Sequence, residues 1–129
     1  MVAELNILQR GGIYLATLDP AKGAGIGKLR PVVVLSAQRI LDIDPPVVFI
    51  CPLSSQSFPA FETLHVILEP RDRLLKISYA LVEHCRSISR QRLRPDRIAM
   101  LSTAEIALVV HRLQRLLDLQ GAEVDPPRQ

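Results

Sequence analysis

The stretch that decides the fold is Lys28-Leu29-Arg30-Pro31-Val32-Val33-Val34-Leu35. The four aliphatic residues after Pro31 are typical of a strand covered on both faces, and they predict a buried strand over residues 31–36. Pro31 favours extended backbone at Arg30 and offers no N–H donor of its own. The guanidinium is therefore expected to leave the sheet at a defined point, which suits a phosphate contact. The alternative is an arginine on the surface of a loop.

Two loops beside predicted strands carry further candidate residues. Gly23, Gly25 and Gly27 precede the stretch and allow another molecule to approach the backbone closely. The segment Pro52-Leu53-Ser54-Ser55-Gln56 places two hydroxyls and an amide where a strand runs into a loop. Sites often form at such strand ends, although serine also occurs in loops because it makes local turn bonds.

The composition indicates one globular domain. The chain has 129 residues, 48% of them hydrophobic, which is enough for one core and too little for a second domain. We expect the domain over residues 1–120 and an unstructured tail over 121–129. The balance of 16 Lys+Arg to 13 Asp+Glu is mildly basic. Five arginines between Arg86 and Arg97, with Asp96 as the single acid, form either a patch for a polyanion or an ordinary solvated surface.

Compartment, membrane and metal chemistry are constrained by simple counts. The sequence shows no basic leader with an apolar run and no segment near the roughly 18 apolar residues that span a membrane, so we expect a cytoplasmic protein with no membrane partner. Cys51 and Cys85 share no zinc-ligand spacing and lie in apolar runs. They are predicted to be buried thiols, with no metal site and no cofactor.

The pattern of strands and breaks predicts a mainly β protein. Strands are expected over residues 13–18, 31–36, 46–53, 63–68 and 79–88. Ser102 and Glu105 form a capping box, apolar residues then recur at helical spacing, and Gly121 is placed to end the helix. A shorter helical turn is predicted over 95–100. The order favours a bent antiparallel sheet or small barrel followed by a C-terminal helix.

Five motifs in order resemble the MazF/PemK toxin family from Arg10 to about Leu119. They are Arg10-Gly11-Gly12-Ile13-Tyr14-Leu15; Leu18-Asp19-Pro20; the glycine-rich loop into Arg30-Pro31-Val32-Val33-Val34-Leu35-Ser36; Pro52-Leu53-Ser54-Ser55-Gln56; and Ser78 with Glu83, Arg86-Ser87-Ile88 and Arg92-Leu93. The resemblance implies an SH3-like barrel of five to seven antiparallel strands with a C-terminal helix, assembled as a homodimer. It also implies a sequence-selective, metal-independent endoribonuclease that cleaves single-stranded mRNA. Such a toxin pairs with an antitoxin that has an acidic, disordered tail.

The resemblance also implies roles for individual residues. The main catalytic positions of the family correspond to Arg30 and Ser54, and the chemistry agrees. Arginine offers a rigid, permanently charged fork of donors, and a neutral hydroxyl donates one more hydrogen bond to a phosphoryl oxygen. Assisting roles in positioning or proton transfer are expected for Gln56, Ser78, Glu83 and His84. RNA contacts are expected from Lys28, Ser55 and Arg86.

The chain departs from the family pattern at two places. Ala24-Gly25-Ile26 stands where the family often has Ser-Glu-Gln, so an acid is missing from that loop. His84 stands where glutamine is common, and histidine exchanges protons near neutrality. Alternation along the predicted strand 79–88 puts Glu83 and His84 on opposite faces, so at most one of them points into the site. His84 is otherwise an ordinary strand histidine.

The remaining histidines and most of the aromatic residues are expected to lie outside the site. His65 and His111 are expected on the surface, and Tyr14, Phe58 and Phe61 are expected to pack rather than stack on bases.

A non-catalytic toxin of the topoisomerase-poisoning CcdB type has the same fold, and the missing acid favours it. A degenerate member that only binds its antitoxin is the third reading. The pairing of Arg30 with Ser54 favours cleavage.

Overall fold

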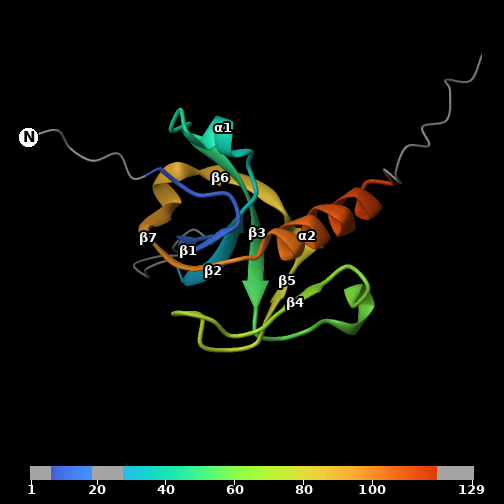
Figure 1. Ribbon diagram of the computed structural model, residues 1–129. Coiled ribbons are helices and arrows are strands. Elements are labelled where there is room, and N and C mark those ends of the chain that lie inside the picture. The colour runs from blue at the N-terminus through green and yellow to red at the C-terminus, as the bar shows by residue number, and fades with distance from the viewer. Residues whose placement is uncertain (1–6, 19–27, 119–129) are drawn as a thin grey trace, which may run out of the picture.

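The computed structural model describes residues 7–18 and 28–118. Within them lie seven strands, two α-helices and three short 3₁₀ turns (Figure 1). The strands are β1 (Gly12–Thr17), β2 (Leu29–Val34), β3 (Val47–Ser54), β4 (Val66–Leu68), β5 (Ser78–Ala80), β6 (Arg86–Ser89) and β7 (Leu93–Met100). The helices are α1 (Gln38–Leu41) and α2 (Thr103–Leu116), and the turns are η1 (Pro59–Phe61), η2 (Val82–His84) and η3 (Arg90–Arg92). None of the helices described is long and apolar enough to cross a membrane.

The strands form one antiparallel sheet in the order β4-β5-β3-β2-β1-β7, with β6 also paired to β3. The prediction of a mainly β fold with a C-terminal helix is confirmed. In the described part of the chain the end strands β4 and β7 do not pair, so the sheet is not closed into a barrel. The predicted strands at 13–18, 31–36 and 46–53 lie within two residues of β1, β2 and β3.

Strand β3 is the centre of the sheet because one of its edges serves two partners. Residues 47–50 pair with β6, whereas Leu53 and Ser54 pair with β5. Leu53 and Ile50 of β3 are three positions apart, whereas their partners, Ala80 and Arg86, are six positions apart. The extra residues of the partner fold into η2. The predicted single strand over 79–88 is therefore wrong, because it consists of two strands joined by a turn.

Two other predicted elements are corrected. The helical turn expected over 95–100 is part of β7, which pairs with β1 through two register shifts. Pro95 is tolerated there because β7 ends the sheet and needs no N–H donor on its outer edge. The strand expected over 63–68 is limited to β4, because residues 62–64 form a turn in which the Leu64 N–H donates to the Phe61 carbonyl at 2.9 Å.

Helix α2 begins where the capping box predicts. The Glu105 N–H donates to Ser102 Oγ at 3.1 Å, and the Ser102 N–H donates to Glu105 Oε1 at 2.8 Å. The helix ends earlier than predicted, because Asp118 rather than Gly121 takes the left-handed backbone after it, with a φ of 60°. Gly121 lies outside the described residues. Gly11 must be glycine, since its φ is 84° and an added Cβ would lie 2.4 Å from Ile106 Cδ1.

The core has two halves, one on each face of the sheet. Val33, Cys51 and Leu53 lie in the half that Val109 of α2 covers, whereas Val32 and Val34 lie in the half covered by Leu41 of α1. Successive valines of β2 thus face opposite sides, as alternation along a strand requires. This burial on both faces confirms what the run of aliphatic residues predicts. It also holds the start of β2 and the end of β3 in place at the rim of the sheet.

Candidate active site

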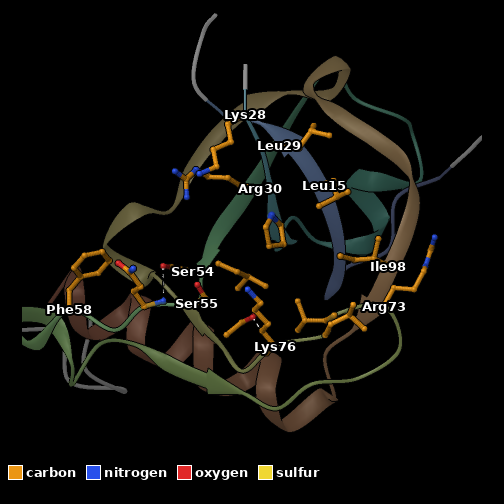
Figure 2. Close-up of a pocket in the computed structure, with 16 residues that line it drawn as sticks. Leu15, Lys28, Leu29, Arg30, Ser54, Ser55, Phe58, Arg73, Lys76 and Ile98 are labelled. Atoms are coloured by element: carbon orange, nitrogen blue, oxygen red, sulfur yellow. Dashed lines mark hydrogen bonds between the residues drawn. The ribbon is translucent and has the colours of Figure 1, made fainter. Parts of the chain in front are cut away.

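A cavity of about 660 Å³ opens where β2 begins and β3 ends (Figure 2). Val32 of β2 pairs with Pro52 of β3 in antiparallel register, so Arg30 and Ser54, each two positions closer to the rim, lie at neighbouring strand ends. Both residues are half-buried and line this cavity. The structure thus brings together the two residues for which the sequence predicts the main catalytic roles.

The cavity is lined by cations and by no described acid. Lys28 and Arg30 lie on one side of it, and Lys76 lies on the opposite side (Figure 2). Arg73 adds a fourth positive charge, and its guanidinium and backbone N–H both donate to carbonyls of β7. Several cations around one concave surface attract a polyanion and raise its local concentration. The arrangement fits a nucleic-acid backbone with more than one phosphate in contact.

Sequence reasoning missed Arg73 and Lys76. Both lie between the predicted strands, in a segment that carries no motif of its own. Ser78 explains part of their placement, because it is 4% exposed and its hydroxyl donates to the Lys76 carbonyl at 3.0 Å. No local signal in the sequence indicates that this segment crosses to the rim of β2 and β3. Ser78 also lines the cavity, so its assisting role stays a prediction.

The hydroxyl and amide groups after β3 are available to a ligand. Ser54 Oγ accepts a hydrogen bond from the Gln56 N–H at 3.0 Å, which orients the oxygen and leaves its own hydrogen to donate. Ser55 and Gln56 are exposed on the same wall of the cavity. Phe58 is 44% exposed and lies beside them. Tyr14, by contrast, is buried and packs in the core as predicted.

A second, smaller pocket of about 270 Å³ shares Arg30 and Ser54 with the first. It adds His84 and Arg86, which come from η2 and β6. The His84 side chain is 63% exposed, so its ring is open to solvent and to a ligand. The paired strand ends are therefore reached from two sides, with a titratable imidazole on the second side.

Glu83 is directed away from these pockets toward His65. His65 Nε2 lies 2.9 Å from Glu83 Oε1 and 2.8 Å from Oε2. The prediction that His65 is a surface residue is wrong, since it is 5% exposed, whereas His111 is exposed as expected. The alternation argument for Glu83 and His84 does not apply, because both belong to a 3₁₀ turn. The structure places His84, and not Glu83, in a pocket with Arg30.

The arginines between Arg86 and Arg97 do not act as one patch. Arg92 donates to the carbonyls of Thr17 at 3.2 Å and Leu18 at 3.0 Å. Arg97 donates to the Gln9 side chain, and Arg90 Nε lies 3.7 Å from Asp44. Arg86 lines the smaller pocket together with Arg30 and His84. Part of this predicted patch therefore connects structural elements.

The glycine-rich loop, with Gly23, Gly25 and Gly27 and the departure at 24–26, lies outside the described residues. Cys51 is buried as predicted, whereas Cys85 is partly exposed and follows η2 instead of lying inside a strand. Among the described residues, no three His, Cys, Asp or Glu side chains gather into a group that could hold a metal ion.

Comparisons with known proteins match this chain to a family of toxins. Residues 9–117 match the model of the PemK-like, MazF-like toxin of type II toxin-antitoxin systems. The endoribonuclease MazF of Staphylococcus epidermidis is 29% identical over 116 residues, covering 89% of this chain and 95% of the relative. The resemblance inferred from the five motifs is thereby confirmed.

Solved structures of the same fold are also similar to this chain. A MazE-MazF complex from Deinococcus radiodurans gives a TM-score of 0.71 at 23% identity, covering 88% of this chain and 99% of that one. Mycobacterium tuberculosis toxin MazF-mt6 gives a TM-score of 0.69 at 18% identity, covering 84% and 98%. Together with the family match over residues 9–117, the fold and the meeting of Arg30 with Ser54 lead to one conclusion: the chain belongs to the PemK-like, MazF-like family of type II toxin-antitoxin toxins.

Proposed function

We propose that this toxin is a metal-independent endoribonuclease that cleaves single-stranded mRNA at selected sequences. The observation that carries the proposal is the meeting of Arg30 and Ser54 at the rim of a cavity lined by four cations and, among the described residues, by no acid. The family match and the name of the Staphylococcus epidermidis relative support the same activity. This substrate implies that the toxin acts in the cytoplasm, where mRNA is found.

The proposed reaction uses the RNA's own 2′-hydroxyl. Its oxygen attacks the adjacent phosphorus, the bond to the 5′-oxygen breaks, and a 2′,3′-cyclic phosphate and a 5′-hydroxyl result. Negative charge grows on the phosphoryl oxygens, where Arg30 binds through its fork of donors and Ser54 through its hydroxyl. Lys28, Ser55, Gln56 and Arg86 contact the flanking nucleotides.

His84 is the proposed acceptor of the 2′-hydroxyl proton. It is exposed in the pocket that also contains Arg30 and Ser54, whereas Glu83 is bonded to His65. Histidine is the side chain that most readily exchanges protons near neutral pH. This assignment supplies a base where the chain has Gly25 in place of an acid.

The antitoxin is the proposed protein partner. The Deinococcus relative is solved in complex with MazE, which supports a partner of that kind. We propose that an acidic, initially disordered segment of the antitoxin folds over the Arg30 cavity and the Arg86 edge of a homodimer. Such a segment loses conformational entropy on binding and offsets that loss through burial and charge pairing. Its affinity is expected to fall as salt rises.

The activity is tested with the purified full chain in excess EDTA. A single-stranded RNA of mixed sequence should be cut at a small set of sites and should carry 2′,3′-cyclic phosphate ends by mass spectrometry. The same sequence in a duplex should resist, since an A-form helix holds the 2′-hydroxyl out of line with the leaving oxygen. The Arg30→Ala variant, purified in parallel, controls for contaminating nucleases. Loss of cleavage with EDTA, or equal cleavage by the variant, would overturn the proposal.

A further inference from the structure

The two cysteines lie one position beyond the end of the β3–β6 pairing, Cys51 within β3 and Cys85 between η2 and β6. The register of β3 with β6 ends at the pair Ile50 and Arg86, so Cys51 and Cys85 are the next residues on each side. Residues directly opposite each other in an antiparallel pair have Cα atoms about 4.5–5.5 Å apart. A disulfide spans about 4.4–6.8 Å between Cα atoms, a range that includes such a separation. Cys85 also packs against the core cluster that contains Cys51.

Both thiols also lie on the same face. Val48, Ile50 and Ile88 belong to the core half on the α1 side, whereas Cys51 belongs to the other half and Cys85 packs against it. Alternation along paired strands thus directs both sulfur atoms to the α2 side. Side chains that face each other on one surface of a sheet are in contact range.

The two thiols differ in exposure and acidity. Cys51 is fully buried, whereas Cys85 is partly exposed. A hydrogen bond with Cys51 lowers the pKa of the Cys85 thiol. The same hydrogen bond, followed by burial, raises the pKa of Cys51. Cys85 is therefore the more accessible and the more acidic of the two thiols, and Cys51 lies behind it.

We propose that Cys51 and Cys85 are a reversible dithiol–disulfide site that hydroperoxides oxidise, and that the bridge slows RNA cleavage. The Cys85 thiolate attacks the peroxide, the O–O bond breaks, and Cys85 becomes a sulfenic acid. The Cys51 sulfur then attacks the Cys85 sulfur, the S–O bond breaks, and water leaves with the Cys51 proton. Two thiols have lost two electrons and two protons, and one hydrogen peroxide has become two waters.

The effect on cleavage rests on the proposed function. Cys85 lies between His84 and Arg86, which line the pocket shared with Arg30. Cys51 is held on its other edge by pairing with Val33, so the adjustment to a bridge falls mainly on η2 and the start of β6. A shift of about 1 Å in a catalytic group can slow a reaction by roughly 100-fold. We expect oxidation to lower the single-turnover cleavage rate by at least tenfold, with full recovery on reduction.

Mass spectrometry of the intact full chain tests the site without reference to RNA. The protein is treated with a small excess of hydrogen peroxide, quenched with catalase, unfolded and alkylated with N-ethylmaleimide. Since the chain has 2 cysteines, the expected product is one species that has lost two hydrogens and takes up no label. After dithiothreitol it should take up two labels. Unchanged double labelling, or a bridge between two chains on a non-reducing gel, would overturn the proposal.

Single-cysteine variants test the order of events. In Cys51→Ala, Cys85 should stop at the sulfenic acid and react with dimedone. In Cys85→Ser, the buried Cys51 should keep its label uptake under the same treatment. Equal oxidation of the two variants would overturn the assigned order.

An RNA-cleavage assay compares untreated, oxidised and re-reduced wild type. Cys85→Ser is the control, because peroxide should leave its cleavage rate unchanged. A bridge that forms without slowing cleavage would overturn the coupling to the site. Untreated protein that never cuts RNA would instead count against the proposed endoribonuclease, and the mass result would remain interpretable.

Discussion

Arg71 and Arg73 are two positions apart in the chain and have opposite surroundings. The Arg71 guanidinium makes a two-pronged ion pair with Glu105, with Nη2 lying 2.7 Å from Oε2. Arg73 lines the cavity with Lys28, Arg30 and Lys76, where no described acid is present. Ion pairs of the first kind connect elements of the fold, here the segment after β4 to the start of α2.

The same contrast separates the two polar regions of the molecule. On the α2 side lie two partnered groups of charges, Arg71 with Glu105 and Glu83 with His65. At the rim of β2 and β3 the cations gather without acidic partners among the described residues, and like charges in one place repel. A bound polyanion relieves that repulsion. The difference therefore separates groups that hold the fold from groups available to a substrate.

Substitution of Arg30 should give the largest effect. Arg30→Ala and Arg30→Lys are each expected to lower single-turnover cleavage by roughly 100- to 1000-fold, the usual loss when one preorganised donor is removed. Lysine keeps the charge and loses the two-pronged geometry. The melting temperature should not change, because Arg30 is half-buried at a strand end. Arg39→Ala, an exposed cation on α1, is the matched control. A fully active Arg30→Lys would mean that only the charge matters.

His84→Gln should slow cleavage by about 100-fold, the typical contribution of a general base. The wild-type rate should rise with pH as expected for catalysis by a general base, and this rise should be absent in the variant. The measurement is the single-turnover rate as a function of pH. His111→Gln, an exposed histidine on α2, is the control. A variant with the parental rate and pH profile would show that a group other than His84 accepts the proton.

Glu83→Gln should instead affect stability. Loss of the carboxylate weakens its bond with the buried His65, and we expect the free energy of unfolding to fall by about 2 kcal/mol. Urea unfolding measures this loss, with the exposed Glu62→Gln as the control. The cleavage rate of the folded variant should stay within twofold of the parent. Lost cleavage with unchanged stability would place Glu83 in the catalytic machinery.

Lys76→Ala should weaken RNA binding by roughly threefold to tenfold at low salt and leave the chemical step unchanged. One phosphate contact fewer should also reduce the slope of log affinity against log salt by about 0.7 for a single strand. Fluorescence anisotropy with a labelled oligonucleotide measures both quantities. Arg115→Ala removes an exposed charge from α2 and serves for comparison. Equal effects of the two substitutions would show that binding senses net charge alone.

Glu105→Gln should give the smallest effect, about 1 kcal/mol of stability at neutral pH. Glutamine still completes a capping box, so the change isolates the ion pair. The Arg71 guanidinium lowers the pKa of Glu105 in the folded chain. As pH falls below the unfolded-chain value of about 4.3, the unfolded state takes up the proton first, so this stabilisation is lost. Urea midpoints of wild type and variant should therefore converge in acid. A gap that does not narrow as the pH falls would contradict the ion-pair explanation.

Local chemistry made a large part of this fold predictable. The aliphatic run of β2, the capping box of α2 and the strand-end positions of Arg30 and Ser54 all depend on neighbours within a few residues. Two of the errors have a common cause. The helical turn expected over 95–100 is part of β7, and the single strand expected over 79–88 is two strands, because both structures depend on partners distant in the chain, β1 and the two halves of β3.

The sequence by itself determined which residues are candidates for the chemistry: an arginine before a proline, a hydroxyl at a strand end, and a histidine beside a glutamate. The tertiary structure decided how each is used. The change of partner along β3 turns Glu83 toward His65, leaves His84 in a pocket with Arg30, and places Cys85 near Cys51. Sheet register also brings Lys76 across to the cavity. Such contacts are set by pairing between distant segments, which the local pattern of the sequence does not encode.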